Sequence, residues 1–69
     1  MKYTINRYKN VLRRTDGVLV EVFVHPETKG RWILSCAEPH RIAERVDEGI
    51  DTYITEDEIR QQFPLVPLD

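Results

Sequence analysis

The sequence contains little of what most enzymes and cofactor-dependent proteins require. Its 69 residues include one cysteine and three glycines. The single cysteine excludes an internal disulfide. The glycines are isolated from one another, which excludes a glycine-rich phosphate loop. The reactive groups are scattered threonine, aspartate and glutamate residues without a supporting catalytic motif. The sequence therefore predicts a protein that is not an enzyme and that has no cofactor, no metal ion and no small-molecule substrate.

Long apolar runs are also missing. No segment approaches the ~20 consecutive apolar residues of a membrane span, and the first residues lack the unbroken apolar stretch of a signal peptide. The single cysteine rules out the disulfide framework of small secreted domains. We expect a protein of the cytoplasm with no membrane contact.

What is present is typical of a small globular domain. Apolar residues make up 41% of the chain and charged residues 32%, a composition that favours folding over disorder. We expect residues 1–69 to form one domain, whose apolar core gives only about 3–5 kcal/mol of net stability.

Charge is unevenly distributed along the chain. Residues 1–31 contain seven Lys or Arg against three Asp or Glu, and residues 32–69 contain three against nine, which gives the net charge of −2. A surface with separated signs bears on partners and association rather than on fold.

Three segments have the pattern of β-strands. Residues 18–24 are apolar on both faces apart from Glu21, which is typical of a central strand. Residues 31–36 follow a turn that runs from proline to glycine, and residues 8–14 precede an Asp-Gly turn. The three segments are expected to form an antiparallel meander.

The loops set the expected register of this meander. A loop at residues 26–30 places Val20 opposite Cys36. At the other turn, a three-residue loop sets Leu12 against Val20 and is preferred to a two-residue turn, which would place cations beside the valines. In this register Trp32, Leu34 and Cys36 share the valine face as core residues.

Two short helices are expected after the strands. Residues 38–49 begin with a proline and stop at a glycine, with Ile42 and Val46 four apart on one face. Thr55 and Glu58 then form a capping box for a second helix. Ile59 and Phe63 face inward from this helix, a proline ends it, and the apolar tail of residues 65–69 packs against the domain.

These patterns predict an α+β domain, in which a three-stranded antiparallel meander precedes two short helices. Residues 51–54 are either an extended link or a fourth, short edge strand. A small SH3-like β-barrel is the main alternative, because short strands joined by basic hairpins also close into barrels.

The second face of the meander is the main candidate for a binding surface. It combines apolar and cationic side chains, namely Val11, Leu19, Phe23 and Ile33 with Arg7, Lys9, Arg13 and Arg31. An exposed patch of this kind marks an interface. The alternative is that the second helix or the C-terminal tail covers the face, and the exposure of Leu19, Phe23 and Ile33 decides between the two.

Two further groups of residues are better explained without a ligand. The acids at positions 44, 47, 48, 51 and 56–58 are expected to form solvated helix faces and dipole-favoured first turns. His25, Cys36 and His40 lack the spacing of a metal site. We expect Cys36 to be a core thiol and both histidines to lie on the surface.

The expected function is that of a non-catalytic binding module, which docks a protein partner or a second copy of itself through the second sheet face. Such small proteins without catalytic parts are also typical of the accessory proteins of phages and mobile elements. The alternative is nucleic-acid binding by the basic hairpins. The cations available for it are Arg7, Lys9, Arg13, Arg14, Lys29 and Arg31.

Overall fold

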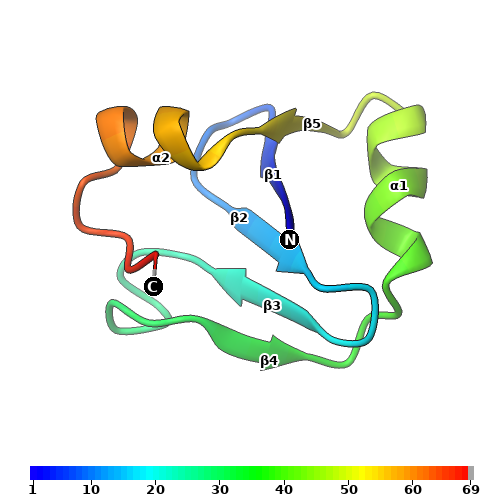
Figure 1. Cartoon of the computed structure of the whole chain (residues 1–69), viewed down its shortest axis with the longest axis horizontal. Coiled ribbons are helices and arrows are strands. Elements are labelled where there is room, and N and C mark those ends of the chain that lie inside the picture. The colour runs from blue at the N-terminus through cyan, green and yellow to red at the C-terminus, as the bar shows by residue number, and fades with distance from the viewer. Residues whose placement is uncertain (69) are drawn as a thin grey trace.

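The computed structural model describes residues 1–68 as an antiparallel sheet with one helix against each face. The elements are β1 (Lys2–Asn6), β2 (Leu12–Thr15), β3 (Val20–Phe23), β4 (Ile33–Ser35), α1 (His40–Asp47), β5 (Asp51–Ile54) and α2 (Glu56–Gln62). The strands lie in the order β4-β3-β2-β1-β5, and each is antiparallel to its neighbours (Figure 1). The expected α+β class is confirmed. The sheet is open, with β4 and β5 at its edges, so the barrel alternative is wrong.

The strand β1 is absent from the sequence prediction, and it changes the start of the meander. The side chain of Asn6 accepts hydrogen bonds from the backbone N–H groups of Asn10 (2.9 Å) and Val11 (3.0 Å). These bonds close a turn over residues 7–10. The predicted strand over 8–14 is therefore wrong in its first half, and the observed strand β2 begins at Leu12. Residues 51–54 do form an edge strand, paired with β1.

One face of the sheet carries the main core and is called the core face here. Tyr3, Ile5, Leu12, Phe23, Trp32, Ile54, Ile59 and Val66 form its buried cluster, against which Phe63 and Leu68 pack. The expected capping box of α2 is present. The tail is fixed by the Trp32 indole N–H, which donates to the carbonyl of Pro67 (2.8 Å). The predicted packing is confirmed for Ile59, Val66 and Leu68, whereas Leu65 is exposed and residue 69 lies outside the described residues.

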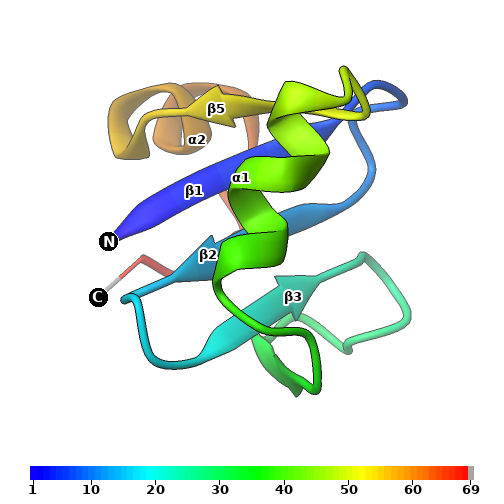
Figure 2. The same ribbon diagram turned by 90° about the vertical axis from the view of Figure 1, so that its right-hand side faces the viewer.

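The opposite face of the sheet is called the α1 face, because α1 crosses it (Figure 2). Ile42 is the buried residue of this helix. Thr4 and Val20 are almost fully buried on the strands. Gly49, at a φ of +76°, ends the helical segment in the left-handed conformation that glycine accepts without strain. The predicted stop at this residue is confirmed.

Both predicted registers of the meander are wrong. Leu12 pairs with Phe23 instead of Val20, because the β2–β3 turn contains four residues. Val20 pairs with Ser35 instead of Cys36, a slip of one residue that exchanges the two faces of β4. The physical reason is aromatic packing, since this register brings the rings of Phe23 and Trp32 to 5.7 Å on the core face.

Within residues 1–68, no helix is both long and apolar enough to cross a membrane.

Candidate protein-binding edge

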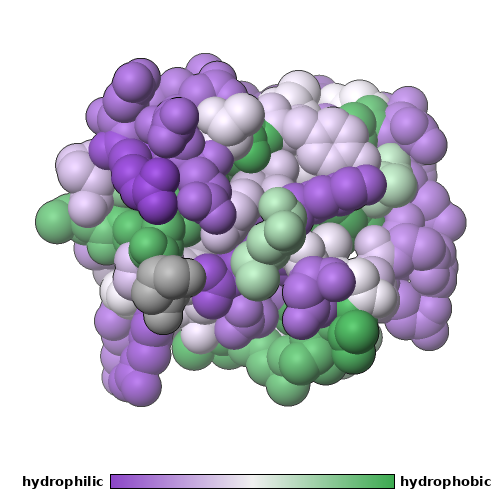
Figure 3. All heavy atoms as spheres, viewed as in Figure 1, coloured by the Kyte–Doolittle hydropathy of each residue, from purple (hydrophilic) through white to green (hydrophobic). Residues whose placement is uncertain are grey.

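The most exposed apolar strand of the sheet is β4, at one of its edges. Leu34 is 62% exposed and Ile33 is 42% exposed, on opposite faces of the strand. Figure 1 shows no element beyond β4 on this side of the sheet, and Figure 3 shows apolar side chains gathered along the same border. An edge strand also presents backbone N–H and C=O groups that lack a sheet partner. The edge therefore combines free hydrogen-bonding groups with apolar surface.

The turn between β2 and β3 enlarges this apolar surface. Val18 is 75% exposed and Leu19 is 54% exposed. They directly precede Val20, which pairs with Ser35, so the turn lies beside the C-terminal end of β4. We call β4 together with Val18 and Leu19 the apolar edge.

The conformation of this turn follows from its polar residues. The carboxylate of Asp16 accepts hydrogen bonds from the backbone N–H groups of Val18 (2.8 Å) and Leu19 (2.9 Å). These bonds lower the pKa of the Asp16 carboxyl. The hydroxyl of Thr15 donates to the carbonyl of Leu19 (2.7 Å), and Gly17 adopts a φ of +94°. The turn therefore holds two apolar side chains in solvent by specific hydrogen bonds to its own backbone.

Charges flank the apolar edge and are absent from its centre. Residues 32–37 contain no charged side chain, whereas Arg31 precedes them and Glu38 follows them. On the core face, Leu34 lies opposite Glu21, whose carboxylate receives a hydrogen bond from Arg14 (2.8 Å). The guanidinium of Arg14 also lies 4.3 Å from the Trp32 ring. The nearest charges behind the edge are thus already paired.

The other edge of the sheet is less suited to a partner. Among the residues of β5, Asp51 and Ile54 are buried and Tyr53 is the exposed large hydrophobic side chain. The ammonium of Lys2 lies 6.0 Å from the centre of the Tyr53 ring, within the range of a cation–π contact. Lys2 lies on β1, the neighbour of this edge strand, so this contact places a cation beside the exposed ring of the edge.

The mixed face expected from the sequence does not form. Phe23 is 5% exposed and lies in the main core. Of the two alternatives for this residue, an exposed binding surface or a face covered by the second helix and the tail, the second is therefore correct. Ile33 lies on the α1 face, and Leu19 lies in a turn. Arg7, Lys9 and Arg31 lie in loops, Val11 directly precedes β2, and Arg13 lies on the α1 face. Exposed apolar residues remain, but they belong to the edge rather than to a face.

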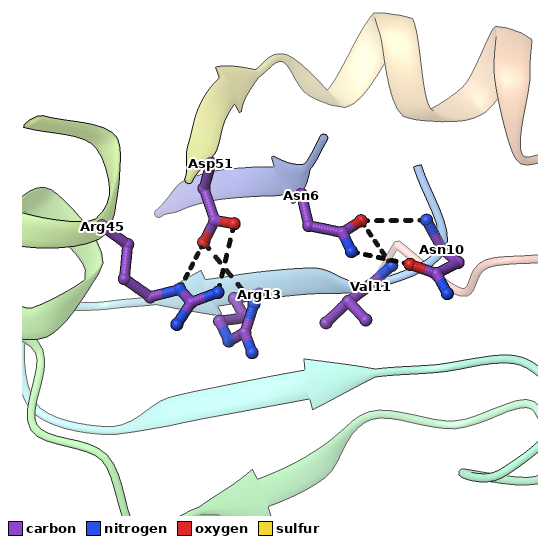
Figure 4. Close-up of polar contacts among 6 residues, drawn as sticks. All are labelled: Asn6, Asn10, Val11, Arg13, Arg45 and Asp51. Carbon is purple, nitrogen blue, oxygen red and sulfur yellow. Dashed lines mark hydrogen bonds and ion pairs between the residues drawn. The ribbon is translucent and has the colours of Figure 1, made fainter. Parts of the chain in front are cut away.

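Arg13 is held in an ion-pair network that ties α1 to the sheet. Figure 4 shows the carboxylate of Asp51 between Arg45 from α1 and Arg13 from β2. Asp51 lies 2.8 Å from Nε of Arg45 and 3.5 Å from Nη1 of Arg13. Burial, and then the positive charge of Arg45, lower the pKa of the Arg13 guanidinium. Asp51 is 1% exposed, so the prediction that it belongs to a solvated acidic surface is wrong.

The histidines and the cysteine do not come together. Cys36 is exposed, so its predicted place in the core is wrong; it lies beyond Ser35, the last paired residue of β4, and outside the core cluster that covers Trp32. His25 and His40 are exposed, as expected, and His40 pairs with Glu38 (3.2 Å). Within residues 1–68, no group of three or more His, Cys, Asp or Glu residues is placed to hold a metal ion.

Cations gather at the end of the sheet opposite the β2–β3 turn. The β1–β2 turn and the β3–β4 loop both lie at this end, and they contain Arg7, Lys9, Lys29 and Arg31. A groove of about 190 Å³ opens beside them, lined by Lys9, Asn10, Leu12, Phe23, His25, Phe63 and Val66. The six cations expected to contact nucleic acid thus divide into four in the loops and two, Arg13 and Arg14, that are paired with carboxylates.

Comparison of the chain with protein-family models, curated proteins and solved structures finds no match.

Sequence reasoning missed Leu34 and Val18 as surface residues. The pattern places Val18 in a central strand that is apolar on both faces, and Leu34 in its neighbour, where it continues the alternation of Trp32. The available signal was the Thr-Asp-Gly sequence at residues 15–17, since an aspartate that caps a turn is compatible with a loop longer than three residues.

Proposed function

We propose that the protein is a non-catalytic binding module that holds another protein chain through its apolar edge. The observation that carries the proposal is Leu34, a large apolar side chain exposed on an edge strand. An extended segment of a partner would extend the sheet by backbone hydrogen bonds, and its side chains would cover Leu34 and Ile33. Covering an exposed leucine, isoleucine or valine contributes about 1–2 kcal/mol.

The proposal is tested by affinity capture from a cell extract with three immobilised baits. They are the wild type, Leu34→Lys and Leu65→Lys. Leu65 is 84% exposed in the tail and does not belong to the apolar edge, so it provides a matched loss of exposed leucine. We expect a protein that is retained by the wild type and by Leu65→Lys and is lost with Leu34→Lys. Equal retention by all three baits would exclude the apolar edge as the binding surface.

Nucleic-acid binding is the second candidate, and one observation favours it: Arg7, Lys9, Lys29 and Arg31 lie in loops at one end of the sheet. Phosphate contacts of this kind weaken steeply as salt rises. Retention of a single-stranded oligonucleotide at ~50 mM salt, lost in the Arg7→Glu/Lys9→Glu variant and kept in Arg60→Glu, would support it. No retention at that salt concentration would reject it.

A further inference from the structure

We infer that the partner at the apolar edge is a second copy of this chain, whose β4 pairs antiparallel with the first about a twofold axis through Leu34. The inference rests on the proposed function, because it names the occupant of the same edge. Pairing would join two sheets of the order β4-β3-β2-β1-β5 into one continuous sheet.

Symmetry restricts how two identical edge strands can pair. In a closed dimer the same patch serves both copies. For antiparallel edges the twofold axis is perpendicular to the sheet, so one residue lies opposite its own copy. In β4 that residue is Ile33, Leu34 or Ser35. Leu34 at the centre covers the most exposed side chain of the strand with its symmetry mate.

The charges at the ends of the segment favour this register. Antiparallel pairing about Leu34 brings the N-terminal flank of each β4, where Arg31 lies near the end of the β3–β4 loop, toward the C-terminal flank of the other, where Glu38 precedes α1. Lys29 lies in the same loop as Arg31, so the cationic flank of each copy faces the acidic flank of its mate, and this arrangement occurs twice. The centre, residues 32–37, has no charge to be buried. The segment is thus complementary to itself when antiparallel, whereas parallel pairing would set like charges together.

The apolar turn lies beside one end of this pairing, on the β3 side of β4 and not along its free border. Val18 and Leu19 lie at the C-terminal end of β4, which antiparallel pairing brings to the Arg31 end of the second copy. A three-residue strand with these flanks buries less than the roughly 1,000 Å² per complex that stable interfaces exceed. We therefore expect a weak dimer that depends on concentration.

The first measurement is the mass of the wild type by sedimentation equilibrium over a concentration series. The expected mass rises with concentration from the 8.2 kDa of one chain toward twice that value. Leu34→Lys is expected to stay monomeric, and Leu65→Lys to behave as the wild type. Circular dichroism verifies the fold of each variant. A wild type that is monomeric throughout, or a dimer unaffected by Leu34→Lys, would overturn the inference.

The second measurement tests the register by charge reversal. Arg31→Glu and Glu38→Lys should each weaken self-association about tenfold, because two symmetric contacts are lost. Glu38→Lys also removes the ion pair between Glu38 and His40 of the same chain, whose side chains are both exposed to solvent. Mixing the two variants pairs each new charge with an opposite one, so dimers should return. Variants that stay monomeric on mixing would exclude this antiparallel pairing.

The two proposals can fail separately. A monomeric wild type whose capture of another protein depends on Leu34 would retain the binding function and replace the second copy with that protein. A monomeric wild type with no capture that depends on Leu34 would reject both.

Discussion

Replacing Asp51 with asparagine should remove most of the stability of the domain. The side chain of Asp51 has no exposed surface. Its carboxylate lies 2.8 Å from Nε and 3.4 Å from Nη2 of Arg45, and 3.5 Å from Nη1 of Arg13. Removing one partner of a buried ion pair costs about 3–5 kcal/mol, because the remaining charge is left without compensation.

Two features of the site reduce this cost. The side chains of Arg45 and Arg13 are 34% and 24% exposed, so water can hydrate both guanidiniums in the variant. Asparagine also keeps one oxygen that can accept a hydrogen bond. We therefore expect a loss of about 2–3 kcal/mol, against a total of about 3–5 kcal/mol for a domain of this size. The midpoint of thermal unfolding should fall by roughly 10–20 °C.

Urea unfolding followed by the fluorescence of the buried Trp32 measures this loss. Asp47→Asn is the matched control, because Asp47 is an exposed acid of the helix that carries Arg45. Its effect should stay within about 0.5 kcal/mol. A loss below about 0.5 kcal/mol for Asp51→Asn would refute the argument that this network ties α1 to the sheet.

Four other predictions concern the core, the tail and the turn. Phe23→Ala should cost about 3–5 kcal/mol in urea unfolding, because the ring is 5% exposed; a loss below about 1 kcal/mol would contradict its place in the core. Thr4→Val should raise stability by about 1 kcal/mol in the same assay, since the buried hydroxyl of Thr4 has no hydrogen-bond partner among residues 1–68; an unchanged or lower midpoint would argue against this. Trp32→Phe removes the hydrogen bond to Pro67 and should speed proteolysis and amide exchange in the tail, whereas tail exchange equal to that of the wild type would exclude this role. Because its pKa is lowered, Asp16 stabilises the fold at pH values above 3.8, and this stabilisation is lost as the pH falls through the folded-state pKa. Asp16→Asn should therefore flatten the plot of stability against pH below pH 3.8. A plot like that of the wild type would count against the hydrogen bonds of the turn.

Local sequence patterns predicted the elements better than their pairing. The capping box of Thr55 and Glu58, the stop at Gly49 and the burial of Trp32 all depend on residues close in sequence or on one large apolar side chain. The register depends on loop length, which the Asp16 turn extends to four residues by its hydrogen bonds to the backbone. At this turn the partner of Leu12 moves by three residues, from Val20 to Phe23, and any odd shift exchanges the faces of a strand.

The candidate surface was predicted only in part for the same reason. Leu19 and Ile33 are exposed as the sequence suggested, whereas Phe23 is covered. Leu34 was expected in the core because it continues the alternation that begins at Trp32. The alternation is correct, but the cover provided by α2 and the tail includes Trp32 and not Leu34.

The sequence by itself determined that the chain forms antiparallel strands and two short helices, and that residues 18–24 are apolar on both faces. The tertiary structure decided which of them remain exposed. The added strand β1 and the packing of Phe23 against Trp32 set the centre of the core and leave β4 at the edge. Likewise, Asp51 reads in sequence as one acid of an exposed series, and only the folded arrangement of α1 and β2 brings two arginines to it. Periodicity describes one segment at a time, whereas burial depends on which segments meet.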